Sequence, residues 1–120
     1  MKQTLEQQRA AHAWEKAQEG IRKHGKDYVN DAKGLPALIM NSGLMQVMAF
    51  LHGKGGRHET LGAHLRDWLH RTHGTPKPFE GFMQHLLQAD ACEFQAITSE
   101  AFAWLKWLRQ MAPAVDKGGD

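Results

Sequence analysis

The sequence predicts an all-α fold, a compact bundle of five to seven helices around a hydrophobic central helix. Between proline and glycine residues, apolar side chains recur at steps of three and four, and no segment alternates apolar and polar residues over a useful length. The 120 residues, 42% of them hydrophobic, suit one compact core. We expect a single helical domain over residues 1–114 and a flexible tail over residues 115–120.

The first predicted helix covers residues 2–21, which contain no proline and are rich in Ala, Gln, Glu and Lys. Its thin apolar stripe indicates close packing against another helix. We expect the helix to stop at Gly25, after two basic side chains, and a short second helix over residues 26–33 to end at Gly34. The stripe consists of Ala10, Ala13, Trp14, Ala17 and Ile21.

The most hydrophobic segment, residues 44–52, is the predicted central helix. Its side chains are apolar on two adjacent faces, which is typical of a helix inside a core. We expect Pro36 to lie in the first turn of a helix before it and residues 41–43 to form a turn. Residues 53–56, which include three glycines, are expected to end it in a loop.

Three further helices follow in the same way. The first covers about residues 58–72, where we expect His64 and Arg66 to point away from the apolar face, and the second covers residues 79–87. The last is expected to begin near Thr98, with Glu100 in its first turn, and to stop at Pro113.

Composition excludes several classes of protein. The net charge of +2 lacks the strongly basic balance of a stand-alone nucleic-acid-binding protein. One cysteine allows no internal disulfide and no cysteine-based zinc cage. No apolar run approaches the roughly 20 residues that span a bilayer, and the first residues lack an apolar signal core. We therefore expect a cytoplasmic protein that does not bind membranes.

The eight histidines do not have the spacing of a metal site. His58, His64 and His70 are six residues apart, about 240° around a helix, whereas helical ligand pairs are three or four apart. His70 and His73 are three apart but precede Gly74, and no HExxH motif occurs. We expect solvated histidines on polar faces, no metal and no cofactor; a metal-dependent enzyme is the third hypothesis.

The remaining candidates for catalysis are also weak. Cys92 lies in an apolar helical setting with Asp90 and Glu93 beside it, and neighbouring carboxylates disfavour a reactive thiolate. We expect this cysteine to be buried and inert. The sequence contains no paired carboxylates, nucleophile elbow, P-loop or dinucleotide-binding motif, so it predicts no enzyme and no catalytic residue.

Several small basic clusters are candidates for contact with phosphates. By charge alone, an ordinary solvated face explains them as well. Aromatic residues give a second hint, because Trp14 or Trp107 would form a protein-contact patch if exposed, although four tryptophans in a small domain also suit a core. The candidate RNA-binding residues are Lys54, Lys106, Arg109, Arg22 and Lys26.

Residues 33–54, KGLPALIMNSGLMQVMAFLHGK, resemble a known family, the fifth, small helical subunit of the Cmr complex, the type III-B CRISPR effector. The matching parts are a Leu-Pro-x-x-Ile turn, an Asn-Gly-Leu-x-Gln helix start and an Ala-Phe-Leu run before a lysine. Similarity continues in residues 65–69 and 100–112. The chain departs from the pattern at the inserted Ser42, at Met48 and in the glycine-rich residues 53–56. The matching residues are Leu35, Pro36, Ile39, Asn41, Gly43, Leu44, Gln46, Ala49, Phe50, Leu51 and Lys54.

The resemblance implies a non-catalytic role in antiviral defence. Copies of such a subunit stack into a minor filament beside the repeating backbone subunits that hold the guide RNA. The filament abuts the large polymerase-like subunit, and target RNA lies between the filaments. Under this interpretation the preferred RNA contacts are Lys54, then Lys106 and Arg109, then Arg22 and Lys26. The alternative is a free helical dimerisation or adaptor domain that does not bind RNA.

Overall fold

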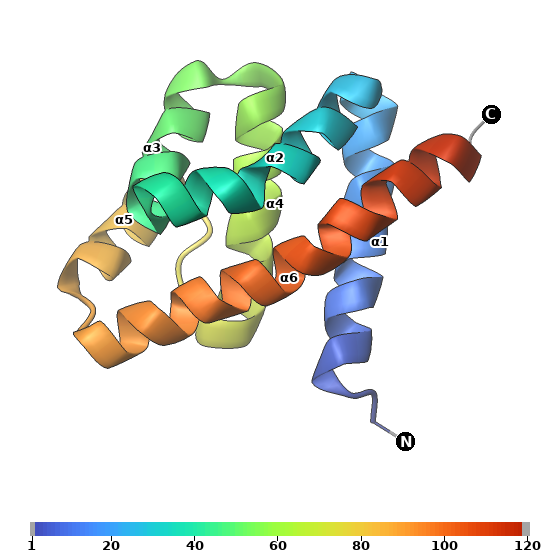
Figure 1. The fold of residues 1–120 in the computed structure, drawn as a ribbon. Helices are drawn as coiled ribbons and strands as arrows, with labels where there is room; N and C mark the ends of the chain where they lie inside the picture. The colour runs from blue at the N-terminus through green and yellow to red at the C-terminus, as the bar shows by residue number, and fades with distance from the viewer. Residues whose placement is uncertain (1, 119–120) are drawn as a thin grey trace.

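A computed structural model describes residues 2–118, which form six α-helices and contain no β-strand (Figure 1). The prediction of an all-α bundle with five to seven helices is confirmed. The elements are α1 (Leu5–His24), α2 (Lys26–Ser42), α3 (Leu44–Lys54), α4 (Gly56–His73), α5 (Phe79–Gln88) and α6 (Ala91–Gly118).

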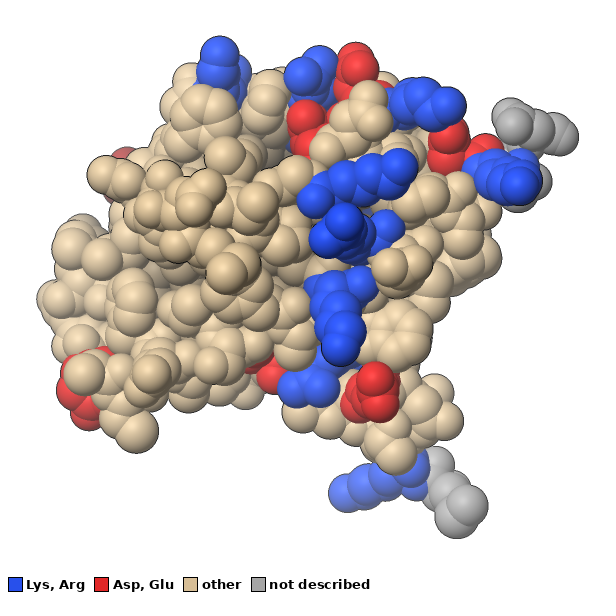
Figure 2. Space-filling view, viewed as in Figure 1, with Lys and Arg blue, Asp and Glu red and all other residues tan. Residues whose placement is uncertain are grey.

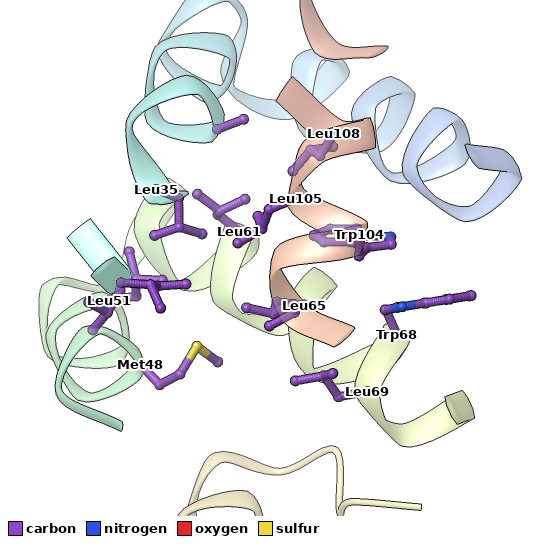
Figure 3. Packing of buried hydrophobic residues seen from close by; sticks show 14 of the residues in the cluster. Leu35, Met48, Leu51, Leu61, Leu65, Trp68, Leu69, Trp104, Leu105 and Leu108 are labelled. Atoms are coloured by element: carbon purple, nitrogen blue, oxygen red, sulfur yellow. The ribbon is translucent and has the colours of Figure 1, made fainter. Parts of the chain in front are cut away.

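Helix α6 is the longest helix and packs most extensively against α1 and α2, whereas α4 is the helix that contacts every other one. Helix α6 is 28 residues long and runs diagonally across the molecule in contact with α1, α2 and α4 (Figure 1). Leu105 and Leu108 face leucines of α4 and α2 (Figure 3), while the indole of Trp104 is hydrogen-bonded to His12 of α1. Buried residues recur at steps of three and four along α6, so one stripe of this helix holds the core together. That stripe consists of Ile97, Ala101, Trp104, Leu105, Leu108 and Ala112.

Helix α3, the segment expected at the centre, lies at one end of the bundle beside α5 (Figure 1). Its inner face is buried, as at Met48 and Leu51, but Ala49 is exposed and Phe50 is 46% exposed. The prediction that residues 44–52 form the central helix is therefore wrong. A helix that is apolar on two faces can lie in a core, as predicted, or can expose one apolar face that another protein covers.

Helix α2 does not stop at Gly34, and Pro36 does not open a new helix; the helix runs through both to Ser42. Proline inside a helix removes one backbone hydrogen bond and costs about 3 kcal/mol. Leu35 and Ile39 are buried on the same side of α2, and burial of each side chain returns about 1.5–3 kcal/mol. Tertiary packing therefore outweighs the local helix breakers.

The boundaries of α6 also differ from the prediction. Asp90 caps the helix, since its Oδ1 accepts a hydrogen bond of 2.8 Å from the backbone N–H of Glu93. The prediction of a start at Thr98 is wrong, because the Thr98 hydroxyl donates to the carbonyl of Phe94 inside the helix, at 3.0 Å. Pro113 does not stop the helix, and residues 115–118 of the expected tail are helical. Residues 119 and 120 lie outside the described residues.

Glycine permits the close approach of α1 and α2. Gly20 is buried, and a Cβ added there would overlap the ring of Tyr28. Gly25, between the two helices, has φ of 64°, in the left-handed region that favours glycine. A side chain at position 20 would therefore force the two helices apart.

Candidate functional site

The structure places the five predicted RNA-binding residues in three separate regions. Lys54 ends α3, and Lys106 and Arg109 lie on α6. Arg22 lies in the last turn of α1 and Lys26 opens α2. All five side chains are exposed, so each is accessible, but they do not form one continuous site.

The clearest gathering of positive charge is a band of Lys and Arg side chains. Figure 2 shows it running down the face on which α2 and α6 cross α1. Lys106 and Arg109 are three residues apart on α6 and both are exposed. Within residues 2–118 neither has a carboxylate oxygen within 4.0 Å, whereas the Nζ of Lys26 lies 3.9 Å from Asp116. Arg22 and Lys54 likewise have no carboxylate oxygen within 4.0 Å among residues 2–118, so Lys106 and Arg109 are distinguished as two unpaired candidates close together on one helix.

Lys54 has a different environment. Its Nζ lies 5.8 Å from the centre of the Phe50 ring, a cation–π distance. It sits at the α3–α4 connection, away from the middle of α6 (Figure 1). Phe50 is itself an exposed apolar residue, so Lys54 lies beside apolar surface and not in the basic band.

The most elaborate polar arrangement was not found by sequence reasoning. Glu100 was expected in the first turn of the last helix, but it lies inside α6 and is buried. Its carboxylate accepts two hydrogen bonds from Arg9, at 2.7 and 2.8 Å, and one from the indole N–H of Trp68, at 2.9 Å. Burial raises the pKa of Glu100, but the bonds from Arg9 and Trp68 outweigh it and the net shift is downward. This ion pair joins α1, α4 and α6.

His12 lies beside that pair, buried between the rings of Trp68 and Trp104. The indole N–H of Trp104 donates to His12 Nδ1 at 2.9 Å, so Nδ1 carries no proton. His12 Nε2 donates to Asp67 Oδ2 at 2.7 Å. Burial is the main cause of the lowered pKa of His12, which is therefore held neutral. Burial raises the pKa of Asp67, but hydrogen bonds from His12 and Lys77 outweigh it and bring the value to about 2.

A second buried histidine, His64 on α4, pairs with Tyr28 on α2. The Tyr28 hydroxyl and His64 Nδ1 are 2.8 Å apart, and His64 Nε2 lies 3.4 Å from Glu19. Burial lowers the pKa of His64 to about 4 and raises that of Tyr28. The prediction of solvated histidines is therefore wrong for His12 and His64. His64 lies three residues after Leu61, on the apolar stripe of α4. Its burial could therefore have been predicted from this spacing.

These buried groups satisfy one another and stabilise the junction of α1, α4 and α6. Residues 2–118 contain no group of three or more His, Cys, Asp or Glu placed to hold a metal ion.

Cys92 is exposed in the first turn of α6, so the prediction that it is buried is wrong. The prediction failed because the apolar sequence around Cys92 was interpreted as a buried helical setting, whereas Cys92 lies at the exposed start of α6. No helix of the described range is sufficiently long and apolar to cross a bilayer.

Three exposed apolar regions complete the surface. On α1, Trp14 is 43% exposed, which suits a residue in contact with another protein. Trp107 is half-buried. At the α5–α6 connection, Leu87 is 69% exposed, and a depression lies nearby over Phe94. Between α2 and α3 lies a groove of about 280 Å³, lined by Leu38, Ser42, Gln46, Val47 and Phe50. In Figure 2 the wide left part of this face carries few charged side chains.

Comparison with known proteins gives a consistent result. A family model described as "CRISPR-associated protein (Cas_Cmr5)" matches residues 5–115. The CRISPR system Cmr subunit Cmr5 of Thermus thermophilus is 27% identical over 108 residues, which cover 88% of this chain and 90% of that protein. The crystal structure of a CRISPR-associated Cmr5 family protein from the same organism superimposes with a TM-score of 0.79 at 27% identity, over 93% of this chain and 97% of that one.

Proposed function

The chain belongs to the Cmr5 family of CRISPR-associated proteins, and on that premise we propose that it is a non-catalytic structural subunit of a type III-B Cmr effector complex. Its partners in this proposal are the repeating backbone subunit, the large polymerase-like subunit and further copies of itself, together with guide and target RNA in the cytoplasm. The family match is the observation that carries the proposal, and the surface of the molecule supports its finer parts.

Stacking of copies into a minor filament is supported by apolar regions on different parts of the molecule. Trp14 lies on α1, and Leu87 lies near the α5–α6 connection at the other side of Figure 1. Two different surfaces that meet head to tail give a heterologous contact, which extends into a filament when the rotation does not close. The longest dimension of one copy is 45 Å.

Contact with RNA is supported by the basic band. Lys106 and Arg109, like Lys54 and Arg22, have no carboxylate oxygen within 4.0 Å among residues 2–118. We place Lys106 and Arg109 first among the RNA-facing residues because they lie exposed three residues apart on one helix. Lys54, Arg22 and Lys26 follow. Because 13 Asp and Glu nearly balance its 15 Lys and Arg, the isolated chain should bind RNA weakly and in a strongly salt-dependent way.

The test is reconstitution of the complex on a guide RNA with the full chain. The wild-type chain is expected to copurify with the backbone subunits; failure to do so, with discrete dimers in isolation, would favour the adaptor alternative and refute the proposal. The double variant Lys106→Glu/Arg109→Glu is expected to enter the complex but to capture target RNA several-fold less well, about tenfold at most for two surface phosphate contacts.

A matched control is the charge-preserving double variant Lys106→Arg/Arg109→Lys, which should capture target RNA as the wild type does. Lys54→Glu is measured in parallel at near-physiological salt, with target RNA capture counted per complex that contains the variant. Unchanged capture by both the Lys54 variant and the double charge reversal would refute the assignment of RNA-binding residues, while leaving membership of the complex intact.

A further inference from the structure

We infer that the groove between α2 and α3 is a docking site for an amphipathic helix of a partner protein that carries an acidic residue beside its apolar side. The inference rests on the proposed function, because the partner is taken to be another protein of the same complex. It assigns a surface and a binding chemistry that are distinct from the basic band and from the regions proposed for stacking.

The groove exists because one side of the α2–α3 hairpin is left uncovered. The inner sides of the two helices are used in the core, as the burial of Ile39 and Met48 shows. On the outer side, Leu38 is 44% exposed and Phe50 is 46% exposed, with Val47 between them as part of the lining. Large apolar side chains facing a concave surface of about 280 Å³ are typical of a site that another protein covers.

The shape suits a helix. Gly43 alone connects α2 to α3, so the two helices stay close and leave a furrow between them. A third helix placed in such a furrow inserts apolar side chains at steps of three and four. Ser42 and Gln46 line the groove near the Gly43 turn and supply neutral hydrogen-bonding groups there.

The charge around the groove selects the partner. Residues 32–58 contain no Asp or Glu, and their cations are Lys33, Lys54 and Arg57. Arg57 is already paired, at 2.9 Å from Asp31 and 3.2 Å from Asp27. Lys54, held over the Phe50 ring, is exposed at the rim. An acidic side chain on the incoming helix would complement that charge, whereas a basic partner would be repelled.

RNA fits this groove less well than protein. None of the five lining residues is charged, and burying a phosphate against leucine, valine and phenylalanine would remove it from water without a counter-charge. The band over α6 offers exposed cations instead. The observations therefore favour a protein occupant, and RNA becomes an outcome of the test.

The experiment uses the full chain and the reconstituted complex. Leu38→Glu and Phe50→Glu place a charge on the groove wall and are expected to reduce association with the other subunits by about tenfold to a hundredfold. Leu5→Glu is the matched control, since Leu5 is 45% exposed at the start of α1, outside the groove, and it should leave association unchanged. Circular dichroism checks that each variant is folded. If a glutamate variant does not fold, Leu38→Ala and Phe50→Ala replace it, and they should also reduce association with the other subunits, by a smaller factor.

The charge requirement is tested with Lys54→Glu in the absence of target RNA, where weaker association with the other subunits is expected and Lys54→Arg should restore it. If the wild-type chain does not enter the complex, the proposed function fails. If the wild type enters and the folded groove variants enter equally well, the inference is overturned while the proposed function stands. Normal entry with loss of target RNA capture only would assign the groove to RNA and also overturn it.

Discussion

The folded chain should lose stability as pH falls from 6.5 toward 4. In this range His64 takes up a proton in the unfolded chain but stays neutral in the folded one. His64 is 8% exposed, its Nδ1 faces the hydroxyl of Tyr28, and its pKa in the folded state is about 4. The charged groups that act on it are Glu19, whose carboxylate is 3.4 Å from His64 Nε2, together with Lys16, His12 and Asp67. Lys16 and His12 oppose protonation and the two carboxylates favour it, but burial is the largest effect.

The sign follows from proton binding. In the unfolded chain the imidazole has a pKa near 6.5, so between pH 6.5 and about 4 the unfolded state binds more protons than the folded state. The contribution of His64 to the free energy of unfolding is therefore complete above pH 6.5 and is lost as pH falls toward 4. At about 1.4 kcal/mol per pH unit the full contribution is about 3 kcal/mol, of which about 2 kcal/mol is lost by pH 5.

His12 acts in the same direction, because its pKa is also lowered by burial. Asp67 affects stability in a lower pH range. Its pKa of about 2 lies below the unfolded value of 3.8, so the stability it contributes is lost only as pH falls from 3.8 toward 2. Measurements above pH 4.5 therefore isolate the histidines from this carboxylate.

The assay is urea unfolding of the wild type and of His64→Gln at pH 7.5 and pH 5.0. The glutamine amide can accept the Tyr28 hydrogen bond but cannot take up a proton in this range. The variant is expected to lose about 2 kcal/mol less than the wild type between the two pH values. His58→Gln, at a half-exposed position, should follow the wild type. Parallel pH dependence of the wild type and His64→Gln would refute the reasoning.

Four further predictions concern stability and exposure. Gly20→Ala should destabilise the chain by about 2 kcal/mol or more in thermal unfolding, because the new methyl group overlaps the ring beside it; Gly62→Ala, whose Cβ would sit at an ordinary 3.5 Å from its neighbours, should be neutral or stabilising. Glu100→Gln should cost about 2–4 kcal/mol in denaturant unfolding, since it leaves a partly buried arginine without its counter-charge. Phe50→Ala should cost only about 1 kcal/mol in the isolated chain, as expected for a ring 46% exposed rather than in the core, and a loss of 3 kcal/mol or more would contradict this. Cys92 should react at once with a thiol reagent in the native protein, and protection until unfolding would contradict its exposure.

Apolar periodicity was sufficient to predict the helical class and most helices, because the stripes on α4, α5 and α6 are the faces that the core buries. It failed where proline and glycine were read as breaks. Gly34, Pro36 and Pro113 lie inside helices, since a cost of about 1 kcal/mol for a glycine or about 3 kcal/mol for a proline is tolerated when the residues around it pack well. Local rules describe the cost of such residues but not the packing that offsets it.

The pairings within the polar core could not be predicted from spacing, because the partners come from distant parts of the chain. Arg9 and Glu100 are 91 residues apart, and His12 and Trp104 are 92 apart. A histidine or glutamate on a helix is exposed by default, and only the arrangement of α1 against α4 and α6 supplies the donor and acceptor that permit burial. The candidate surfaces behave likewise: the exposure of Phe50 depends on which helices occupy the centre, and here they are α4 and α6 rather than α3.

The near-neutral composition is compatible with contact between this chain and RNA because charge is unevenly distributed. Acidic side chains such as Glu100, Asp67 and Asp31 are engaged with internal partners, while Lys106 and Arg109 remain exposed and unpaired within residues 2–118. A surface divided into a basic band and an uncharged apolar region can meet RNA on one side and protein on the other. A net charge of +2 would supply too little attraction for RNA alone, so the division favours binding inside an assembly, where neighbouring subunits add both cations and contact area.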